Sequence, residues 1–147
     1  MNKILLYIVV ILAAAGRHEE TEVNYGSFNN VEYVYNYDGD TITVNINGVH
    51  PIIGKEMPIR VLGIDTPEID GQCPEEIALA TDARDFVTNQ LSTATIINLN
   101  NIDRGKYFRI LADVQYDGKD LATILLDNGY ALPYDGGTKT NWCEYLK

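Results

Sequence analysis

The feature that most constrains the fold is a pair of short runs in which apolar and polar residues alternate. One run covers residues 31–37 (VEYVYNY) and the other covers residues 41–46 (TITVNI). A period of two places alternate side chains on one face of a β-strand. Asp38 and Gly39 separate the runs, and this dipeptide is typical of a tight turn between paired strands. The sequence therefore predicts a β-hairpin at this point.

The rest of the chain continues in short elements of both types. Further strands are predicted at residues 59–64, 94–99 and 106–116, with turn residues between them. Apolar residues at helical spacing predict helices over residues 75–91 and 120–128. The order of three strands, a helix, two strands and a helix indicates an α+β fold that is mainly β. This order favours a small closed barrel with helices on its side.

The composition fits one packed domain and excludes several kinds of site. The chain has 147 residues, of which 46% are hydrophobic, and this is enough for a single core. Two Cys and two His are too few for a zinc site with four such ligands. Asp and Glu number 21 against 11 Lys and Arg, a net charge of −10, which disfavours binding of duplex nucleic acid through a basic patch. The carboxylates leave open a site for a hard cation, which prefers oxygen ligands.

The N-terminus has the pattern of a secretory signal. Lys3 precedes an apolar run over residues 4–15, and the run ends in small residues that predict cleavage after Ala15. A helix of about 12 residues spans about 18 Å, which is short of the roughly 30 Å core of a bilayer. We therefore expect a secreted or periplasmic protein; an uncleaved, outward-facing membrane anchor is the alternative. Residues 16–30 are polar and without periodicity, and they predict a linker before a domain over 31–147.

Two acidic loops and two arginines stand out against this background. The loops are DGDT at residues 38–41 and DTPE at residues 65–68, and both follow predicted strands. Arg60 and Arg109 lie inside predicted strands that are otherwise mostly apolar, where a guanidinium needs an anionic partner. Acidic turns are often only solvated. The four groups could form a mutual ion-pair network, or they could surround a metal ion and a phosphate.

The order of four motifs resembles the thermonuclease, or staphylococcal nuclease-like, family. These motifs are DGDT (38–41), IRVLGIDTPE (59–68), DRGKYFRILADV (103–114) and LLDNGYA (125–131). The resemblance extends from about residue 31 to the C-terminus. It implies a five-stranded OB-type β-barrel with about three helices. It also implies an enzyme that hydrolyses DNA and RNA phosphodiesters with Ca²⁺ as its cofactor and leaves 3′-phosphate products.

The resemblance also implies a role for each residue of a calcium site. The carboxylates of Asp40 and Asp65 and the backbone carbonyl of Thr66 are expected to be ligands of Ca²⁺. This ion accepts six to eight oxygens in loose geometry, so water and a phosphate oxygen would complete the coordination. Asp38 is expected to hold the ligand residues in position without itself binding the ion.

The remaining catalytic and substrate contacts follow from the same resemblance. Glu68 is expected to act as the general base that activates water. Arg60 and Arg109 are expected to hold the phosphate oxygens, since the guanidinium fork donates two hydrogen bonds at once. Three further residues are expected to contact the nucleotide: Lys106, Tyr107 and Tyr134.

The acidic charge of this chain departs from the strongly basic character of the best-known family member. It repels nucleic acid, so we expect it to weaken substrate binding more than the chemical step.

The expected substrates are single-stranded or denatured DNA and RNA, cleaved by a monomer without an obligate protein partner. A non-catalytic OB-fold module that binds nucleic acid or protein is the alternative. The presence of Asp40, Asp65, Glu68, Arg60 and Arg109 favours the enzyme. The loop after Glu68 is short, which leaves the placement of Glu68 open.

Two cysteines lie far apart in the sequence. Cys73 precedes the longer predicted helix, and Cys143 lies close to the C-terminus. An even number of cysteines in an oxidising compartment predicts a disulfide, and two free buried thiols are the alternative. Trp142, next to Cys143, is interpreted as a packing residue.

Overall fold

The computed structural model describes residues 25–147, so the expected signal segment lies outside the described residues. Within that range the elements run as follows: β1 (Glu32–Asn36), β2 (Thr41–Asn45), α1 (Pro51–Gly54), β3 (Met57–Val61), β4 (Ile64–Asp65), α2 (Pro74–Ser92), β5 (Ile97–Arg104), β6 (Ile110–Tyr116), β7 (Lys119–Asp120), α3 (Leu121–Asp127), β8 (Leu132–Pro133) and α4 (Trp142–Tyr145). The α+β class with a predominance of sheet is confirmed.

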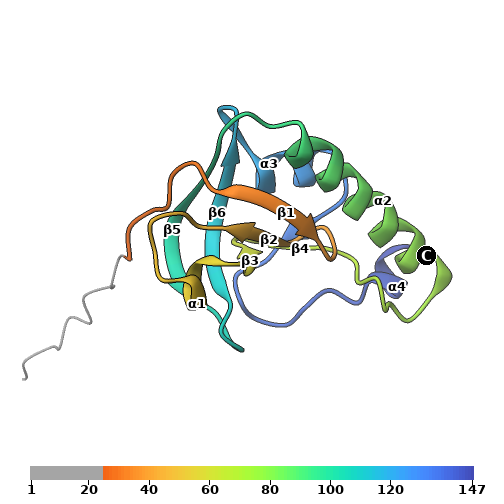
Figure 1. The fold of residues 1–147 in the computed structure, drawn as a ribbon. Coiled ribbons are helices and arrows are strands. Elements are labelled where there is room, and N and C mark those ends of the chain that lie inside the picture. Colours follow the sequence, from red (N-terminus) through yellow and green to blue (C-terminus); the bar gives the residue numbers. More distant parts are fainter. Residues whose placement is uncertain (1–24) are drawn as a thin grey trace, which may run out of the picture.

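The main sheet has the strand order β1-β2-β3-β6-β5, with β7 paired to β6. Neighbouring strands are antiparallel except for β3 and β6, which run parallel. Strands β4 and β8 form a separate two-stranded sheet. Figure 1 shows the main sheet curling, with α2 along one side and α4 beside the first turn of α2. The predicted β-hairpin is confirmed as β1 and β2.

The named strands do not close the sheet into a ring, but the segment before β1 connects its two edges. The backbone N–H and C=O groups of Phe28 bond those of Leu99 in β5, at 2.9 and 2.8 Å. The N–H of Val31 donates to Ile97, also in β5, at 2.9 Å. Residues 28–31 thus lie against β5 while the chain continues directly into β1. The folded part therefore begins before residue 31, within the stretch expected to be a linker.

Alternation fails within β1 because the strand contains a bulge. The pairing register of β1 with β2 shifts between Tyr33 and Tyr35. A shift of one residue moves all following side chains to the opposite face of a strand. Tyr35 and Tyr37 are consequently 54% and 51% exposed, whereas Asn36 is buried. The apolar face expected over residues 31–37 therefore ends at Tyr33.

Several predicted boundaries need correction. The strand expected at 94–99 is β5, which runs from Ile97 to Arg104. The strand expected at 106–116 is β6, which begins only at Ile110. The strand expected at 59–64 is divided into β3 and β4. The short helix α1 lies between β2 and β3, where the sequence predicts no helix. His50 caps it, because its ring nitrogen accepts from the N–H of Ile52. Helix α2 matches its expected range to within one residue at each end.

The core lies between the curled sheet and the two longer helices. Helix α2 contributes Ala80, Ala83, Val87 and Leu91, all buried, whereas Ile77, one turn before Ala80, is 41% exposed. The largest fully buried apolar side chains are Ile42, Ile59, Ile64, Leu91, Leu99, Leu121 and Leu125. Among the described residues, no helix has the length and apolar character to cross a bilayer.

Candidate active site

The two acidic loops meet at one end of the sheet. The N–H of Thr66, just after β4, donates to Oδ2 of Asp40 at 3.1 Å. Asp40, Asp65 and Thr66 are all buried. The approach is close because Gly39 has no side chain. A Cβ atom at that position would lie 2.9 Å from a methyl carbon of Thr66 and 3.2 Å from Ala83 in α2. The hairpin turn is therefore packed directly against the second acidic loop.

Arg60 of β3 lies between the two carboxylates. One of its terminal nitrogens contacts Oδ1 of Asp40, and the other lies 3.6 Å from Oδ1 of Asp65. It also donates to the carbonyl oxygen of Ile64 at 3.2 Å. Burial lowers the pKa of Arg60, and the charges of Asp38 and Asp65 act in the opposite direction. The arginine that the sequence marks as unusual thus has anionic partners inside the protein.

Asp38 supports the turn from behind. Its Oδ1 accepts from the N–H of Asp40 at 3.0 Å and from the N–H of Thr41 at 2.7 Å. Burial raises the pKa of the Asp38 carboxyl, and the negative charge of Glu68 raises it further. The side chain fixes the backbone of Asp40 at the cost of an unfavourably buried charge.

This raised pKa predicts a pH-dependent effect of the substitution Asp38→Asn. An acid whose pKa is higher in the folded state destabilises that state as pH rises from its ordinary pKa through the raised one. Asparagine keeps the acceptor oxygen and carries no charge. In the presence of a chelator, Asp38→Asn should therefore have a higher midpoint of thermal unfolding than wild type at pH 7. The difference should vanish below the ordinary Asp range. Identical unfolding midpoints across the whole pH series would contradict this account.

The carboxylate of Asp65 accepts hydrogen bonds through one of its two oxygens. Its Oδ2 accepts from the N–H of Thr140 and from the indole N–H of Trp142, both at 3.2 Å. Its Oδ1 is buried and has no hydrogen-bond partner among the described residues. The sequence predicts that Trp142 is a packing residue, and it is buried against the ring of Tyr145. Its indole N–H has a further contact that the sequence does not predict, the bond to an expected metal ligand.

Glu68 lies on the same loop and is half exposed, and two residues that sequence reasoning missed fix its position. The ammonium group of Lys139 contacts its carboxylate and lies 3.6 Å from Oδ1 of Asp65. The buried carboxylate of Glu76 accepts from the N–H of Glu68 at 3.3 Å and from the N–H of Gln72 at 3.0 Å. The short loop after Glu68 is thus tied to the first turn of α2. No periodic signal in the sequence marks Lys139 or Glu76 for these contacts.

Among the described residues, Lys106, Tyr107 and Tyr134 make no hydrogen bond or ion pair with Asp40, Asp65 or Glu68. Lys106 and Tyr107 are in the turn between β5 and β6, where Tyr107 is 94% exposed. The hydroxyl of Tyr134 donates to the carbonyl oxygen of Gly137 at 3.0 Å. Arg109 is the last residue of that turn before β6, and its positive charge lowers the pKa of Arg60. The structure therefore brings the expected metal ligands together around Arg60, and within the described residues it shows no bond between them and the expected nucleotide contacts.

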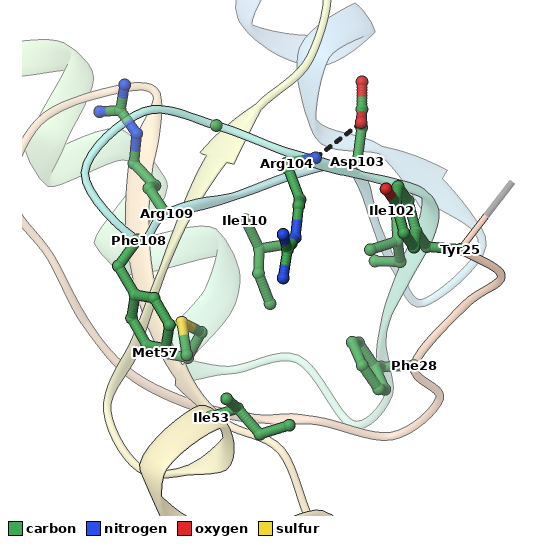
Figure 2. Close-up of a pocket in the computed structure, with 11 residues that line it drawn as sticks. Tyr25, Phe28, Ile53, Met57, Ile102, Asp103, Arg104, Phe108, Arg109 and Ile110 are labelled. Atoms are coloured by element: carbon green, nitrogen blue, oxygen red, sulfur yellow. Dashed lines mark hydrogen bonds between the residues drawn. The ribbon is translucent and has the colours of Figure 1, made fainter. Parts of the chain in front are cut away.

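Arg109 also lies at the margin of an apolar pocket at the β5–β6 end of the sheet. Figure 2 shows Arg104 extending into this pocket while the guanidinium of Arg109 turns away from it. The lining is mostly apolar and excludes the expected metal ligands: it consists of Tyr25, Phe28, Ile53, Met57, Ile102, Asp103, Arg104, Gly105, Phe108, Arg109 and Ile110. The pocket is therefore separate from the acidic corner, the name used here for the two acidic loops with Asp38, Asp40, Asp65, Thr66 and Glu68.

In the described part of the chain, three buried side-chain polar atoms have no hydrogen-bond partner, and two of them belong to the acidic corner. Among residues 25–147 these atoms are Oδ1 of Asp65, Oγ1 of Thr66 and Nε of Arg109. Native proteins satisfy nearly all such atoms, so each exception points to strain or to a group that binds there. All three belong to residues that the sequence singles out.

Comparison with known proteins identifies the family of this chain. The family model described as staphylococcal nuclease homologue matches residues 58–144, more than half of the chain. The chain belongs to the staphylococcal nuclease family. Among curated proteins, none matches it in sequence. The OB-type fold expected from the motifs is that of this family, which points to a nuclease or to a nucleic-acid-binding module.

One feature beyond the family motifs is a disulfide between Cys73 and Cys143, with Cα atoms 5.8 Å apart. It joins α4 to the start of α2 (Figure 1). The two sulfur atoms and a carboxylate oxygen of Glu76 lie within 4.8 Å of one another. Because the sulfurs are bonded to each other, they are not thiolate ligands, and this cluster is a covalent anchor for the C-terminal segment.

Proposed function

We propose that this member of the staphylococcal nuclease family is a Ca²⁺-dependent nuclease that cleaves single-stranded or denatured DNA and RNA and leaves 3′-phosphate ends. One observation carries the proposal. Two buried carboxylates, Asp40 and Asp65, converge on Arg60, and an oxygen of Asp65 has no hydrogen-bond partner in the described part of the chain. Arg60 compensates part of this buried negative charge, and a bound cation would supply the partner that Oδ1 of Asp65 lacks.

The donor set of this corner fits calcium. Asp40 and Asp65 offer carboxylate oxygens, and the carbonyl of Thr66 belongs to the same turn of backbone. Hard cations of the calcium type bind such oxygen ligands, with water completing the coordination. When bound, the ion would neutralise charge that develops on a phosphate during hydrolysis. Asp38 keeps the Asp40 backbone in place for this role.

The remaining residues supply the chemistry around the phosphate. Glu68 would take a proton from the attacking water, which forms a new bond to phosphorus as the bond to the 5′ oxygen breaks. Arg60 and Arg109 would donate hydrogen bonds to the phosphate oxygens. The unpartnered Nε of Arg109 supports this role.

The surface properties favour flexible single strands as substrates. The net charge of −10 opposes close approach of a duplex, although physiological salt screens charges beyond about 8 Å. Exposed Tyr107 is suited to stacking on an unpaired base. Lys106 and Tyr134 would add contacts to the same nucleotide, and we expect the enzyme to act as a monomer.

The disulfide supports export of the protein. Disulfides persist in oxidising compartments and are rare in the cytosol. Together with the signal pattern of residues 1–15, the Cys73–Cys143 bond favours a protein outside the cytosol. The shortness of the apolar run then favours a secreted or periplasmic enzyme over a membrane-anchored one. The N-terminal residue of the exported protein would distinguish these two locations.

The direct test is cleavage of heat-denatured DNA and of RNA with millimolar Ca²⁺ and with a calcium chelator. We expect cleavage only with Ca²⁺ and 3′-phosphate at the product ends. Folded wild-type protein that cleaves neither substrate over a range of salt and pH would favour the non-catalytic OB-fold module instead.

Lys139 gives a second prediction about this site. Its ammonium lies beside Asp65 and Glu68, so it competes with any cation drawn to these carboxylates. A half-exposed ion pair contributes about 0.2–1 kcal/mol, which corresponds to a change in affinity of up to about fivefold. The variant Lys139→Met should therefore bind Ca²⁺ about two- to fivefold more tightly in a calorimetric titration, whereas Lys139→Arg should match wild type. Weaker binding by Lys139→Met would show that Lys139 assists the site.

A further inference from the structure

The two oxygens of the Asp65 carboxylate have different surroundings. Oδ2 receives two donors from the C-terminal segment, the N–H of Thr140 and the indole N–H of Trp142. Oδ1 faces Arg60 and Lys139 at 3.6 Å and accepts no hydrogen bond in the described part of the chain. The carboxylate is thus bonded on one side and left available on the side of the acidic corner.

The indole that makes this contact is itself firmly placed. Trp142 is 2% exposed, begins α4 and immediately precedes Cys143. The disulfide to Cys73 fixes the neighbouring residue to the start of α2. The ring of Tyr145 packs edge-on against the indole, with centroids 5.6 Å apart. A segment without long helices or strands is therefore held against Asp65 by one covalent bond and by ring packing.

We propose that Trp142 is a positioning residue of the cation site: its indole N–H holds Oδ2 of Asp65 so that Oδ1 is presented to the ion, and the Cys73–Cys143 disulfide anchors the indole for this purpose. The inference rests on the proposed function, because it assumes that Asp65 is a ligand.

The physical reason lies in the freedom of a carboxylate. The terminal torsion of Asp is broad and nearly two-fold, so a carboxylate without directional partners can turn both oxygens toward a neighbouring cation such as Arg60. Two donors on Oδ2 restrict that rotation before the ion arrives. Removal of a group that hydrogen-bonds a metal ligand and orients it typically weakens metal binding about 10–100-fold.

The test compares Ca²⁺ affinity, measured by calorimetric titration, in wild type and in two single variants. Trp142→Phe keeps an aromatic ring and loses the N–H donor, and we expect affinity about 10–100-fold weaker. Tyr145→Phe keeps the ring that packs on the indole and loses a hydroxyl outside this contact, and its affinity should equal that of wild type. Wild-type affinity in a folded Trp142→Phe variant would overturn the proposal.

A measurement on the wild-type protein does not depend on the folding of any variant. Trp142 is the only tryptophan of the chain, so excitation selective for tryptophan should sensitise emission from Tb³⁺ bound beside Asp65. Calcium should displace that signal. Reduction of the disulfide in protein that remains folded by circular dichroism should weaken Tb³⁺ binding about tenfold or more. Bound Tb³⁺ without sensitised emission, or unchanged affinity after reduction, would overturn the proposal.

Failure of the proposed calcium site and failure of the proposed role of Trp142 give different results. Wild-type protein that binds neither Ca²⁺ nor Tb³⁺ would remove the proposed calcium site and this inference with it. Wild-type protein that binds both ions, with Trp142→Phe at equal affinity, would remove only the role of Trp142.

Discussion

The variant Glu68→Gln is expected to cleave about 10²–10⁴-fold more slowly than wild type, since this is the usual contribution of a positioned general base. Glutamine has nearly the same shape and cannot accept the proton of the attacking water. The bond from the N–H of residue 68 to Glu76 involves the backbone and is retained. The measurement is single-turnover cleavage of a single-stranded DNA at saturating Ca²⁺.

Two controls separate this loss from a change in folding or in metal binding. The contact between Glu68 and Lys139 is half exposed, so its loss should cost at most about 1 kcal/mol of unfolding free energy. Calcium affinity should change by no more than about fivefold, the effect of one half-exposed neighbouring charge, because Glu68 is not a proposed ligand. If Glu68→Gln cleaves within tenfold of the wild-type rate, another group acts as the base.

Replacement of Arg109 by alanine should lower the cleavage rate still further, by a factor of about 10³–10⁵. This is the contribution typical of an arginine directed at a transferring phosphoryl group. The side chain of Arg109 forms no ion pair or hydrogen bond among the described residues, so its removal breaks no internal contact of that kind. The variant should therefore unfold at nearly the wild-type temperature while single-turnover cleavage almost disappears.

The matched comparison for this prediction is Arg109→Lys. Lysine keeps the positive charge and loses the planar fork that can bond two phosphate oxygens. Activity between that of wild type and Arg109→Ala would indicate that both charge and geometry contribute. Full activity of Arg109→Ala would remove Arg109 from the proposed mechanism.

Local patterns were sufficient to predict the hairpin, the longer helices and the unusual arginines. Arg60 could be identified because a charge within an apolar strand needs a partner, and the nearest acidic loops flank its strand in sequence. The α+β class followed in the same way from the order of short elements. Family motifs then assigned roles that the spacing of residues alone left open.

Other parts depended on tertiary packing and had no local signal. The bulge that exposes Tyr35 interrupts an alternation that continues unchanged in the sequence. Trp142 and Lys139 reach Asp65 and Glu68 across more than seventy positions of chain. They do so in a segment without periodicity, and the cysteine pair indicated only that this segment is tied to α2. The tryptophan next to the second cysteine was the available clue.

The backbone pairing of Phe28 and Val31 with β5 has a consequence for behaviour in crowded solution. A strand whose amide groups are unpaired is a template onto which another polypeptide can add, and this is a common route to aggregation. The lead-in segment occupies this position along β5. The protein thus shields a hydrophobic sheet from intermolecular pairing with a piece of its own chain.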